Sequence, residues 1–507
     1  MEFLRVTPES VGVPSQAVID LLDELYRYGI EMHGIMLLRH GKLYAEGHWK
    51  PYNAQTPHIL FSFSKSLTST AIGFAVQEGI ISLDDYLVDL FPDKIPSEPS
   101  ENLKKCQVRH LLMMGCGHET EIPNLGDGDP DWISAFLHHP FVYEPGTHFL
   151  YNTAGTNMLS AIITRKTGLS LTQFLKPRLF QPLGMGDVHC YVMPDGTEMG
   201  GAGMYLTLDA MARFVQFVAN KGLWEGKRLL NESWFDMATS KQIENRGAGW
   251  GGDPDWQVGY GFQFWRCAQP GVFRGDGAYG QYGVVLTHQD AAVVIHSCST
   301  RLQAVLTAVW EKLLPAFVDG PLPEDRHAQH RLEKRLEHLE LNPMLGMRNP
   351  GAEQSLNGAV YAPDGPAPGL VDLIGGGGHF KPEGSTLQSL EFVFQGDDAR
   401  LVFQQDNGRI ELPVGITGHF SCAEIGDTIF GTNARWRAKN KLELEVRNTR
   451  MVTGARLLLQ FDGSKLTLTG DRTVPESGGL SGDPVPTLAF TLQEGEINTK
   501  TKMYWEQ

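Results

Sequence analysis

The spacing of apolar residues changes character along the chain. Up to about residue 314, segments with helical periodicity are mixed with short apolar runs, and the runs that predict strands lie at the two ends of this part, over 34–48 and 259–296. The helical repeat is clear in an early segment, where one face carries Val18, Leu21, Leu22 and Leu25. This pattern predicts an α/β (α+β) fold, in which an antiparallel sheet is flanked by helices and accompanied by a helical subdomain.

A different pattern begins after about Asn357. Short alternating runs separated by Gly, Asp and Asn turns indicate a small all-β barrel or sandwich. The runs are Leu390–Phe394, Arg400–Phe403, Lys441–Val446, Arg456–Phe461 and Lys465–Leu468. Pro315–Arg326 is rich in proline and reads as a linker. We therefore predict a first domain over residues 1–320, a linker with a short charged helix over 321–345, and a C-terminal β-barrel domain over 346–507.

Composition narrows the class of protein. A chain of 507 residues is too long for one ordinary domain, and 41% hydrophobic with 20% charged residues is typical of a soluble globular protein. The net charge of -16 argues against partners such as nucleic acid or an anionic membrane. The N-terminal segment has no basic region followed by an apolar core, no apolar run could span a bilayer, and the six cysteines form no C-x-x-C pair. We therefore expect a cytoplasmic protein without disulfides, metal or organic cofactor.

The first candidate for chemistry is an S-x-x-K tetrad. Ser62 and Lys65 stand three residues apart in a segment with helical spacing, so their side chains share one face. A serine hydroxyl becomes a nucleophile when a neighbouring base takes its proton, and a lysine can be that base if burial lowers its pKa. Apolar residues flank the tetrad at Leu60, Phe61 and Phe63. The structural alternative is that Ser62 caps a helix and Lys65 is solvated.

Two later segments complete a pattern. Tyr151-Asn152-Thr153 follows a Pro-Gly turn, and Gly277-x-x-Gly280-Gln281 lies in a glycine-rich strand. In order and spacing, these segments and the tetrad resemble serine β-lactamase and penicillin-binding-protein-like hydrolases, in particular the branch of class C β-lactamases, family VIII carboxylesterases and D-aminopeptidases. The resemblance extends over residues 1–314 and includes the further segments His110–Gly117, Glu144–Tyr151 and Pro182–Met185. It implies a β-lactamase-like first domain, and the C-terminal part resembles the lipocalin-like barrels appended to this family.

The resemblance also implies roles. Ser62 would attack a carbonyl to form an acyl-enzyme and Lys65 would take its proton. Tyr151, as phenolate or through shared hydrogen bonds, would pass a proton to the leaving group. The oxyanion hole would be the backbone N–H of Ser62 and one from the strand around Gly277 and Ala278. Asn152 would orient Lys65 or the substrate carbonyl.

Two positions depart from the family pattern. Thr153 stands where an asparagine is usual, and a hydroxyl cannot supply the amide contact used in β-lactam recognition. The third motif, K-T-G or H-x-G, is replaced by Arg274-Gly275-Asp276-Gly277. An acidic Asp276 would repel the carboxylate of a penicillin or a D-Ala-D-Ala peptide, although Arg274 could compensate or simply pair with it. An acidic rim would suit a substrate with a free amine.

These observations favour a serine hydrolase acting on a small-molecule ester or amide. Three alternatives stay open: a D-amino-acid peptidase or an enzyme of the β-lactamase or DD-peptidase type; an acyltransferase that uses the same acyl-enzyme; and a non-catalytic binding module on the same fold. The natural substrate is not readable from the sequence, and a homo-oligomer is compatible with it.

Overall fold

The protein was analysed as a computed structural model. The structure describes residues 2–122, 131–248, 252–341, 343–375, 384–396, 398–416, 418–426, 428–474, 483–493 and 504. The chain divides into two compact units. The first consists of Met1–Gly47 and Pro57–Glu337, and the second of His48–Thr56 and His338–Gln507. Within the described residues, no helix is both long and apolar enough to cross a membrane.

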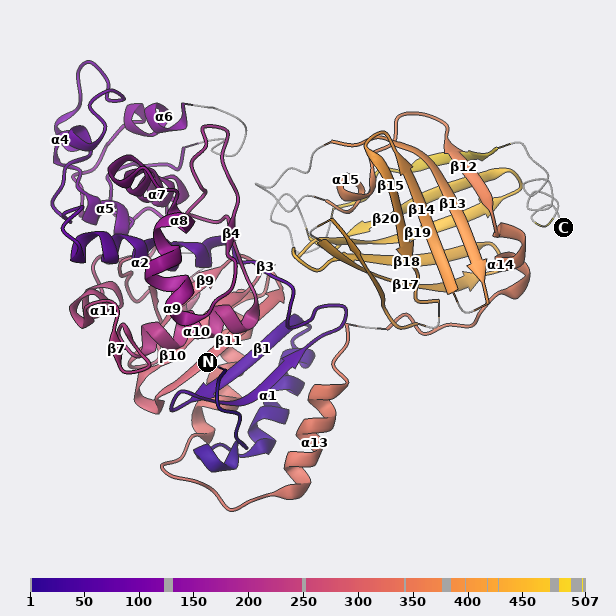
Figure 1. Ribbon diagram of the computed structural model, residues 1–507, viewed down its shortest axis with the longest axis horizontal. Helices are drawn as coiled ribbons and strands as arrows, with labels where there is room; N and C mark the ends of the chain where they lie inside the picture. The colour runs from indigo at the N-terminus through magenta and orange to yellow at the C-terminus, as the bar shows by residue number, and fades with distance from the viewer. Residues whose placement is uncertain are drawn as a thin grey trace. The chain divides into compact units, whose positions relative to one another are not determined.

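The first unit contains the expected antiparallel sheet. Its six strands lie in the order β2-β1-β11-β10-β9-β8 (Figure 1). Strand β1, near the start of the unit, therefore pairs with β11, which lies more than 200 residues later in the chain. The strands are β1 Glu31–Arg39, β2 Lys42–His48, β8 Trp265–Arg266, β9 Val272–Gly277, β10 Gln281–Leu286 and β11 Ala291–Cys298. Residues on both faces of β9 and β10 are buried, which requires cover on both sides of the sheet.

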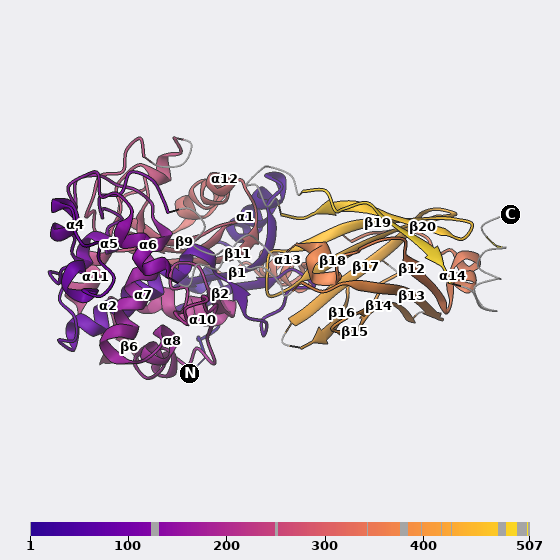
Figure 2. The ribbon, with the colours of Figure 1, turned by 90° about the horizontal axis from the view of Figure 1, so that it is seen from above.

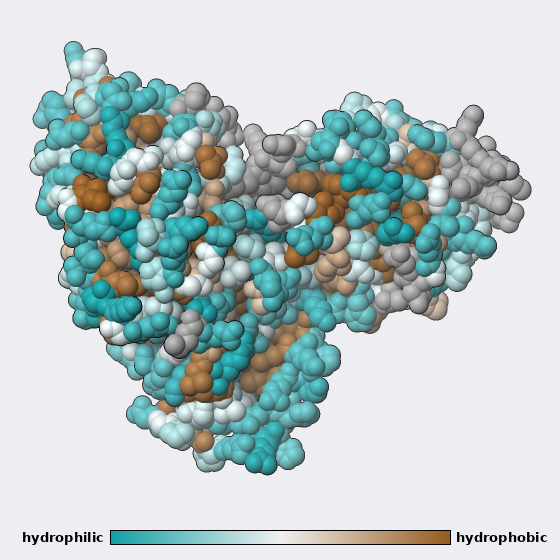
Figure 3. Space-filling model, in the orientation of Figure 1, coloured by the Kyte–Doolittle hydropathy of each residue, from teal (hydrophilic) through white to brown (hydrophobic). Residues whose placement is uncertain are grey.

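Helices provide that cover. Helix α10, Leu208–Ala219, packs against β1, β10 and β11. Helix α1, Ser15–Arg27, buries the predicted apolar face and packs against α13, Arg326–Glu337. The outer side of α13 is hydrophilic (Figure 3), as its charged sequence predicts.

The helical subdomain is built around two buried helices, α2 Ser64–Gln77 and α7 Thr153–Thr167, which pack against each other. Short helices accompany them: α3 Leu87–Leu90, α4 Glu101–Lys105, α5 Val108–Leu112, α6 Trp132–His138, α8 Leu171–Leu175, α9 Gln181–Leu183 and α11 Glu232–Ala238. Helix α12, Leu302–Ala308, packs instead against α1. The small strands are β3 His58–Ile59, β4 His189–Cys190, β5 Met204–Leu206, β6 Leu223–Trp224 and β7 Lys227–Arg228.

The second unit confirms the all-β prediction. Ten antiparallel strands form one sheet in the order β15-β14-β13-β12-β21-β20-β19-β18-β17-β16, and its end strands β15 and β16 approach each other, so the sheet nearly closes into a barrel (Figure 2). The strands are β12 Ala359–Pro363, β13 Leu387–Gln395, β14 Asp398–Gln405, β15 Gly408–Pro413, β16 Ser421–Ile425, β17 Thr428–Ala438, β18 Lys441–Asn448, β19 Gly454–Asp462, β20 Lys465–Arg472 and β21 Leu488–Leu492, with helices α14 Pro350–Leu356 and α15 Leu370–Ile374. Its core includes Tyr361, Phe403, Leu457 and Phe490.

Candidate active site

Ser62 lies in a tight turn between a strand and a helix. The turn is a 3₁₀ segment, Phe61–Phe63, that follows β3 and leads directly into α2. Phe61 has a φ of 46°, a left-handed conformation that strains a bulky side chain. Helix α2 is anchored within the unit, because Ser66 Oγ donates to the carbonyl oxygen of Gln263 at 2.8 Å. The surroundings thus hold the turn at Phe61, directly before Ser62, in a conformation that the local sequence does not favour.

Lys65 is the buried neighbour of the Ser62 hydroxyl. Its side chain is 1% exposed, and its Nζ lies 3.1 Å from Ser62 Oγ. Nζ also lies 2.6 Å from the carbonyl oxygen of Gly201 and 3.3 Å from Thr153 Oγ1. A neutral amine has two N–H donors for these two oxygens, and its lone pair is then directed at the Ser62 hydroxyl.

The electrostatic surroundings suit a lysine that is deprotonated near neutral pH. Burial lowers the pKa of Lys65 to about 7, and the carboxylates of Glu121 and Asp276 limit the shift. At neutral pH, a substantial share of the protein therefore holds Lys65 as a free amine. This is the state in which it can accept a proton from Ser62.

Tyr151 lies beside both Lys65 and Ser62. Its ring centroid is 5.0 Å from Lys65 Nζ, and the ring stacks on Trp265 with centroids 5.4 Å apart and an interplanar angle of 21°. Burial raises the pKa of the Tyr151 hydroxyl well above its ordinary value, and a hydrogen bond with Ser62 opposes the rise. Tyr151 is therefore a neutral phenol, able to donate a proton, rather than a phenolate.

The two residues after Tyr151 have different surroundings from those expected. Asn152 is 1% exposed; its Oδ1 accepts a hydrogen bond from the N–H of Gly155, and its Nδ2 lies 3.2 Å from His118 Nδ1. It thus caps α7. The oxygen beside Lys65 belongs to Thr153, so the contact expected of Asn152 is made by its neighbour.

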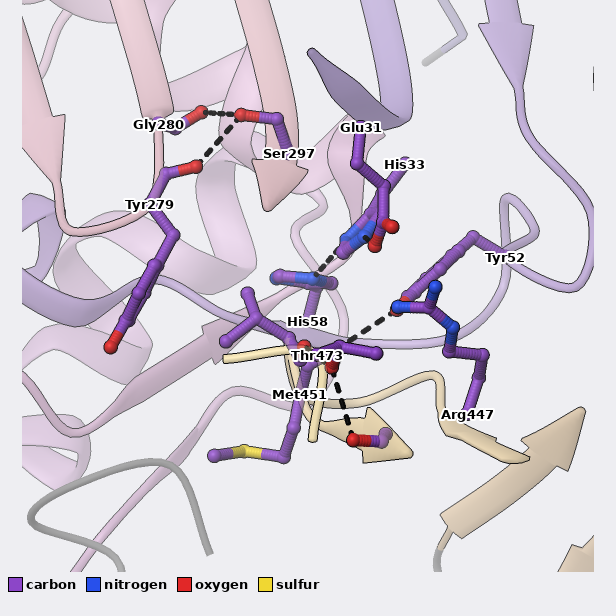
Figure 4. Close-up of polar contacts among 12 residues, drawn as sticks. Glu31, His33, Tyr52, His58, Tyr279, Gly280, Ser297, Arg447, Met451 and Thr473 are labelled. Carbon is purple, nitrogen blue, oxygen red and sulfur yellow. Dashed lines mark hydrogen bonds and ion pairs between the residues drawn. The ribbon is translucent and has the colours of Figure 1, made fainter. Parts of the chain in front are cut away.

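The glycine-rich strand β9 lies directly against the Ser62 turn. A Cβ on Gly277 would lie 2.1 Å from the carbonyl oxygen of Leu60, so only glycine allows this approach. The following turn is braced, because Ser297 Oγ lies 2.9 Å from the carbonyl oxygens of both Tyr279 and Gly280 (Figure 4). The Ala278 carbonyl accepts a hydrogen bond from Gln281 Nε2 at 3.1 Å. The backbone at Ala278 is thus fixed beside the Ser62 turn.

Arg274 and Asp276 form a buried ion pair. Their side chains are 0% and 3% exposed, and Arg274 Nε lies 2.9 Å from Asp276 Oδ2. The Arg274 guanidinium also lies 4.3 Å from the ring centroid of Trp256. Burial raises the pKa of Asp276, and the guanidinium opposes that rise. Two roles were considered for Arg274, compensation for the charge of Asp276 toward a substrate carboxylate and simple pairing with Asp276. The structure shows the pairing.

The sequence of the first unit matches a known family. The family model described as Beta-lactamase covers residues 18–309, which is more than half of the chain. The chain belongs to the β-lactamase family. The enzymes of this family that it resembles are serine hydrolases, and the antiparallel sheet with its helices agrees with the fold that the sequence resemblance implied.

Curated relatives of this β-lactamase-family chain are similar over part of their length. A D-aminopeptidase of Brucella anthropi is 28% identical over 246 residues, covering 43% of this chain and 44% of the relative. A β-lactamase of Escherichia coli is 23% identical over 228 residues, covering 40% of this chain and 58% of the relative. The chain thus spans about half the length of these relatives. A solved β-lactamase-like protein of Bacteroides dorei matches 56% of this chain and 91% of its own, with a TM-score of 0.50 at 18% identity, which shows the fold alone.

In this β-lactamase-family site, sequence reasoning missed Glu121. The Glu121 carboxylate accepts a hydrogen bond from the N–H of Thr153 at 3.0 Å and acts electrostatically on Lys65 and Tyr151. It lies in residues 117–130, a segment rich in Gly, Pro, Asp and Glu and without a periodic pattern. The acidic composition of that loop was the available signal, but its contact with the start of α7 depends on tertiary structure.

Proposed function

We propose that this chain is a serine hydrolase that cleaves a small-molecule ester or amide through an acyl-enzyme on Ser62. The observation that carries the proposal is the 3.1 Å contact between Ser62 Oγ and the buried Nζ of Lys65, whose pKa lies at about 7. A serine and a lysine in this arrangement can exchange a proton without a histidine.

Acylation begins when neutral Lys65 takes the hydroxyl proton and Ser62 Oγ attacks the carbonyl carbon. The backbone N–H groups of Ser62 and Ala278 stabilise the oxyanion, which typically contributes about 3 kcal/mol for each donor. The closeness of Gly277 to the Ser62 turn supports this pairing of donors.

The leaving group then departs with a proton from Tyr151, and Tyr151 is reprotonated by Lys65, which carries the proton that it took from Ser62. Water attacks the acyl-enzyme in the second half of the reaction, and the same groups pass protons in the opposite direction. If an alcohol or amine replaces water in this half, the outcome is acyl transfer. That activity shares every residue named here, and product analysis with added alcohol separates it from hydrolysis.

A substrate that carries a positive charge is the second candidate, favoured by the carboxylate of Glu121 beside Thr153. Asp276 is neutralised by its ion pair with Arg274, so Glu121, which acts electrostatically on Lys65, is the source of negative potential for a ligand. A free amine would be attracted and the carboxylate of a β-lactam or a DD-peptide repelled. Similarity to a D-aminopeptidase agrees with this candidate.

Hydrolysis of p-nitrophenyl butyrate by the wild type and by Ser62→Ala tests the proposal. We expect turnover that falls to background in the variant. Turnover that survives Ser62→Ala would show that the site is elsewhere, and a folded wild type inactive on esters and amides alike would favour the binding module.

Charge preference can be tested with two isosteric esters. p-Nitrophenyl 4-(trimethylammonio)butyrate and p-nitrophenyl 5,5-dimethylhexanoate differ only in a positive nitrogen replacing a carbon. We expect a ratio of kcat/KM that favours the charged ester by about fivefold, and Glu121→Gln to remove most of this preference. A ratio unaffected by Glu121→Gln would reject Glu121 as the source of charge selection.

A further inference from the structure

A chain of polar contacts lies next to the strand that carries the Ser62 turn. His33 on β1 and His58 on β3 are buried, with exposures of 1% and 2%. His33 Nδ1 lies 2.9 Å from His58 Nε2, and His58 Nδ1 lies 2.8 Å from the carbonyl oxygen of Ile59. At the other end, His33 Nε2 lies 3.2 Å from Glu31 Oε1 (Figure 4).

Counting protons along this chain gives a definite result. The Ile59 carbonyl can only accept, so His58 Nδ1 must carry a hydrogen. The contact between the two rings needs one hydrogen, and the contact of His33 Nε2 with the Glu31 carboxylate needs another. Three hydrogens are required, whereas two neutral imidazole rings supply two.

The third proton belongs on His33. We assign the proton to a ring rather than to Glu31, because a carboxylate in direct contact with an imidazole favours the charged form of that ring. Burial lowers the pKa of His58 well below its ordinary value, and His296 and His33 lower it further. His33 is the ring with a carboxylate as its direct partner.

We propose that His33 is held as an imidazolium between Glu31 and His58, and that this charged chain positions the Ser62 turn. His33, His58 and Glu31 are positioning residues in this scheme and do not touch the reacting atoms. The activity part of the proposal rests on the function proposed above, whereas the protonation part does not.

The backbone around His33 is shaped for this contact. The pairing of β1 with β11 shifts register between Met32 and Gly34, so His33 is the extra residue of a β-bulge. Bulges of this kind re-aim a side chain and occur beside active sites. Here the bulge directs His33 to a residue of β3 rather than to a neighbour in its own sheet.

The chain reaches the nucleophile through a short stretch of backbone. His58 and Ile59 pair with Leu206 and Tyr205 of β5, and the N–H of Leu60 donates to the carbonyl of Met204 at 2.9 Å. Phe61, with its strained φ of 46°, and then Ser62 follow immediately. A fixed β3 therefore limits the freedom of the turn that Ser62 occupies.

Strand β11 connects the same chain to the second oxyanion donor. The ring of His296 stacks on His58, with centroids 4.7 Å apart and an interplanar angle of 22°. The next residue, Ser297, braces the Tyr279–Gly280 turn after Ala278. The Ser62 turn after β3 and the Tyr279–Gly280 turn after Ala278 are thus both connected to the cluster of His33, His58 and His296.

The titratable groups that face His33 and His58 include Glu31 on β1 and His296 on β11. The Glu31 side chain is 27% exposed, whereas His33 is shielded from water. Within the described part of the chain, no group of three or more His, Cys, Asp or Glu is arranged to hold a metal ion.

Solid-state ¹⁵N NMR of histidine-labelled protein tests the protonation state. At about pH 8.5 an ordinary histidine, with a pKa near 6.5, is about 1% charged. We expect one imidazolium ring among the 17 histidines of the wild type. It should be absent from Glu31→Gln, because the glutamine amide donates to His33 Nε2 and removes the need for the third proton. Asp290→Asn is the matched control, since it removes a carboxylate 2.9 Å from the exposed His40.

Each NMR outcome decides the first part of the proposal. An imidazolium signal present in the wild type and in Asp290→Asn but lost in Glu31→Gln supports it. No imidazolium in the wild type, or one that survives Glu31→Gln, overturns it. These readings do not depend on activity, so they stand even if the protein proves not to be a hydrolase.

The pH profile with p-nitrophenyl butyrate tests the positioning role. When the third proton is lost at high pH, a ring lone pair faces the Glu31 carboxylate and the chain loosens, so we expect kcat of the wild type to fall about tenfold on that limb. Glu31→Gln should lack the limb, because its contacts need no third proton. An alkaline limb identical in both proteins, with the NMR result as expected, would reject positioning while leaving the imidazolium in place.

Discussion

Gly277→Ala tests the closeness of β9 to the nucleophile turn. The new Cβ would lie 2.1 Å from the carbonyl oxygen of Leu60, whereas ordinary contact begins at 3.4 Å. The obstacle is backbone, which cannot rotate away, so the two segments must separate by about 1.3 Å. That separation moves the Ala278 N–H away from the Ser62 N–H.

The expected loss can be estimated from two independent magnitudes. A displacement of about 1 Å in a catalytic arrangement lowers the rate on the order of 100-fold, and loss of one oxyanion donor lowers kcat by about 100- to 1000-fold. We therefore expect kcat for p-nitrophenyl butyrate to fall about 100-fold, which corresponds to roughly 2.7 kcal/mol. Overpacking of this kind should also lower the free energy of unfolding by about 1–3 kcal/mol.

The assay combines steady-state kinetics with calorimetric unfolding of the purified variant. Gly365→Ala is the control, because a Cβ at Gly365 meets nothing within 4 Å. It should leave both kcat and Tm close to the wild type. If Gly277→Ala folds and retains kcat within about threefold of the wild type, the approach of β9 is not needed for catalysis and the oxyanion assignment is refuted.

Three further predictions concern the charges and hydroxyls around Lys65. We expect kcat/KM to rise with pH through about 7 as Lys65 loses its proton, and Glu121→Gln to move this midpoint to lower pH, because the carboxylate raises the pKa of Lys65; an unchanged midpoint in a pH series would contradict this electrostatic coupling. Thr153→Val removes the hydroxyl 3.3 Å from Nζ and should lower kcat/KM about fivefold to tenfold in the same assay, unlike Thr153→Ser, which keeps the oxygen. Arg274→Met leaves buried Asp276 without its cation and should reduce the free energy of unfolding in urea by about 3–5 kcal/mol; the added change Asp276→Asn should restore part of that stability, and no restoration would argue against the ion pair.

The local pattern of hydrophobic and polar residues was sufficient to predict the architecture of the two units. The 3.6-residue repeat of α1 and the alternation after Asn357 depend on which face of each element is buried, and both appear directly in the order of residues. Ser62 and Lys65 were recognisable for the same reason, since one helical turn brings residues three apart together.

Contacts between segments that lie far apart in the sequence could not be predicted from these local patterns. Thr153 takes the contact expected of Asn152 because the side chain of Asn152 is used to cap α7, a choice between neighbours that spacing alone does not make. Glu121 reaches the site through the backbone of Thr153, from a loop without a periodic signal.

The sequence by itself determined the order of the elements, the character of the two units and the pair of residues proposed as nucleophile and base, because these depend on neighbours within a few residues. Tertiary structure decided how these groups behave. The pKa of Lys65 is lowered by burial among segments far apart in the chain, and the ion pair of Arg274 with Asp276 exists in a setting closed by Trp256. The protonation proposed for His33 likewise depends on a β-bulge that brings β1 to β3. Desolvation and hydrogen-bond partners are properties of packing, and packing is set by residues that the sequence keeps far apart.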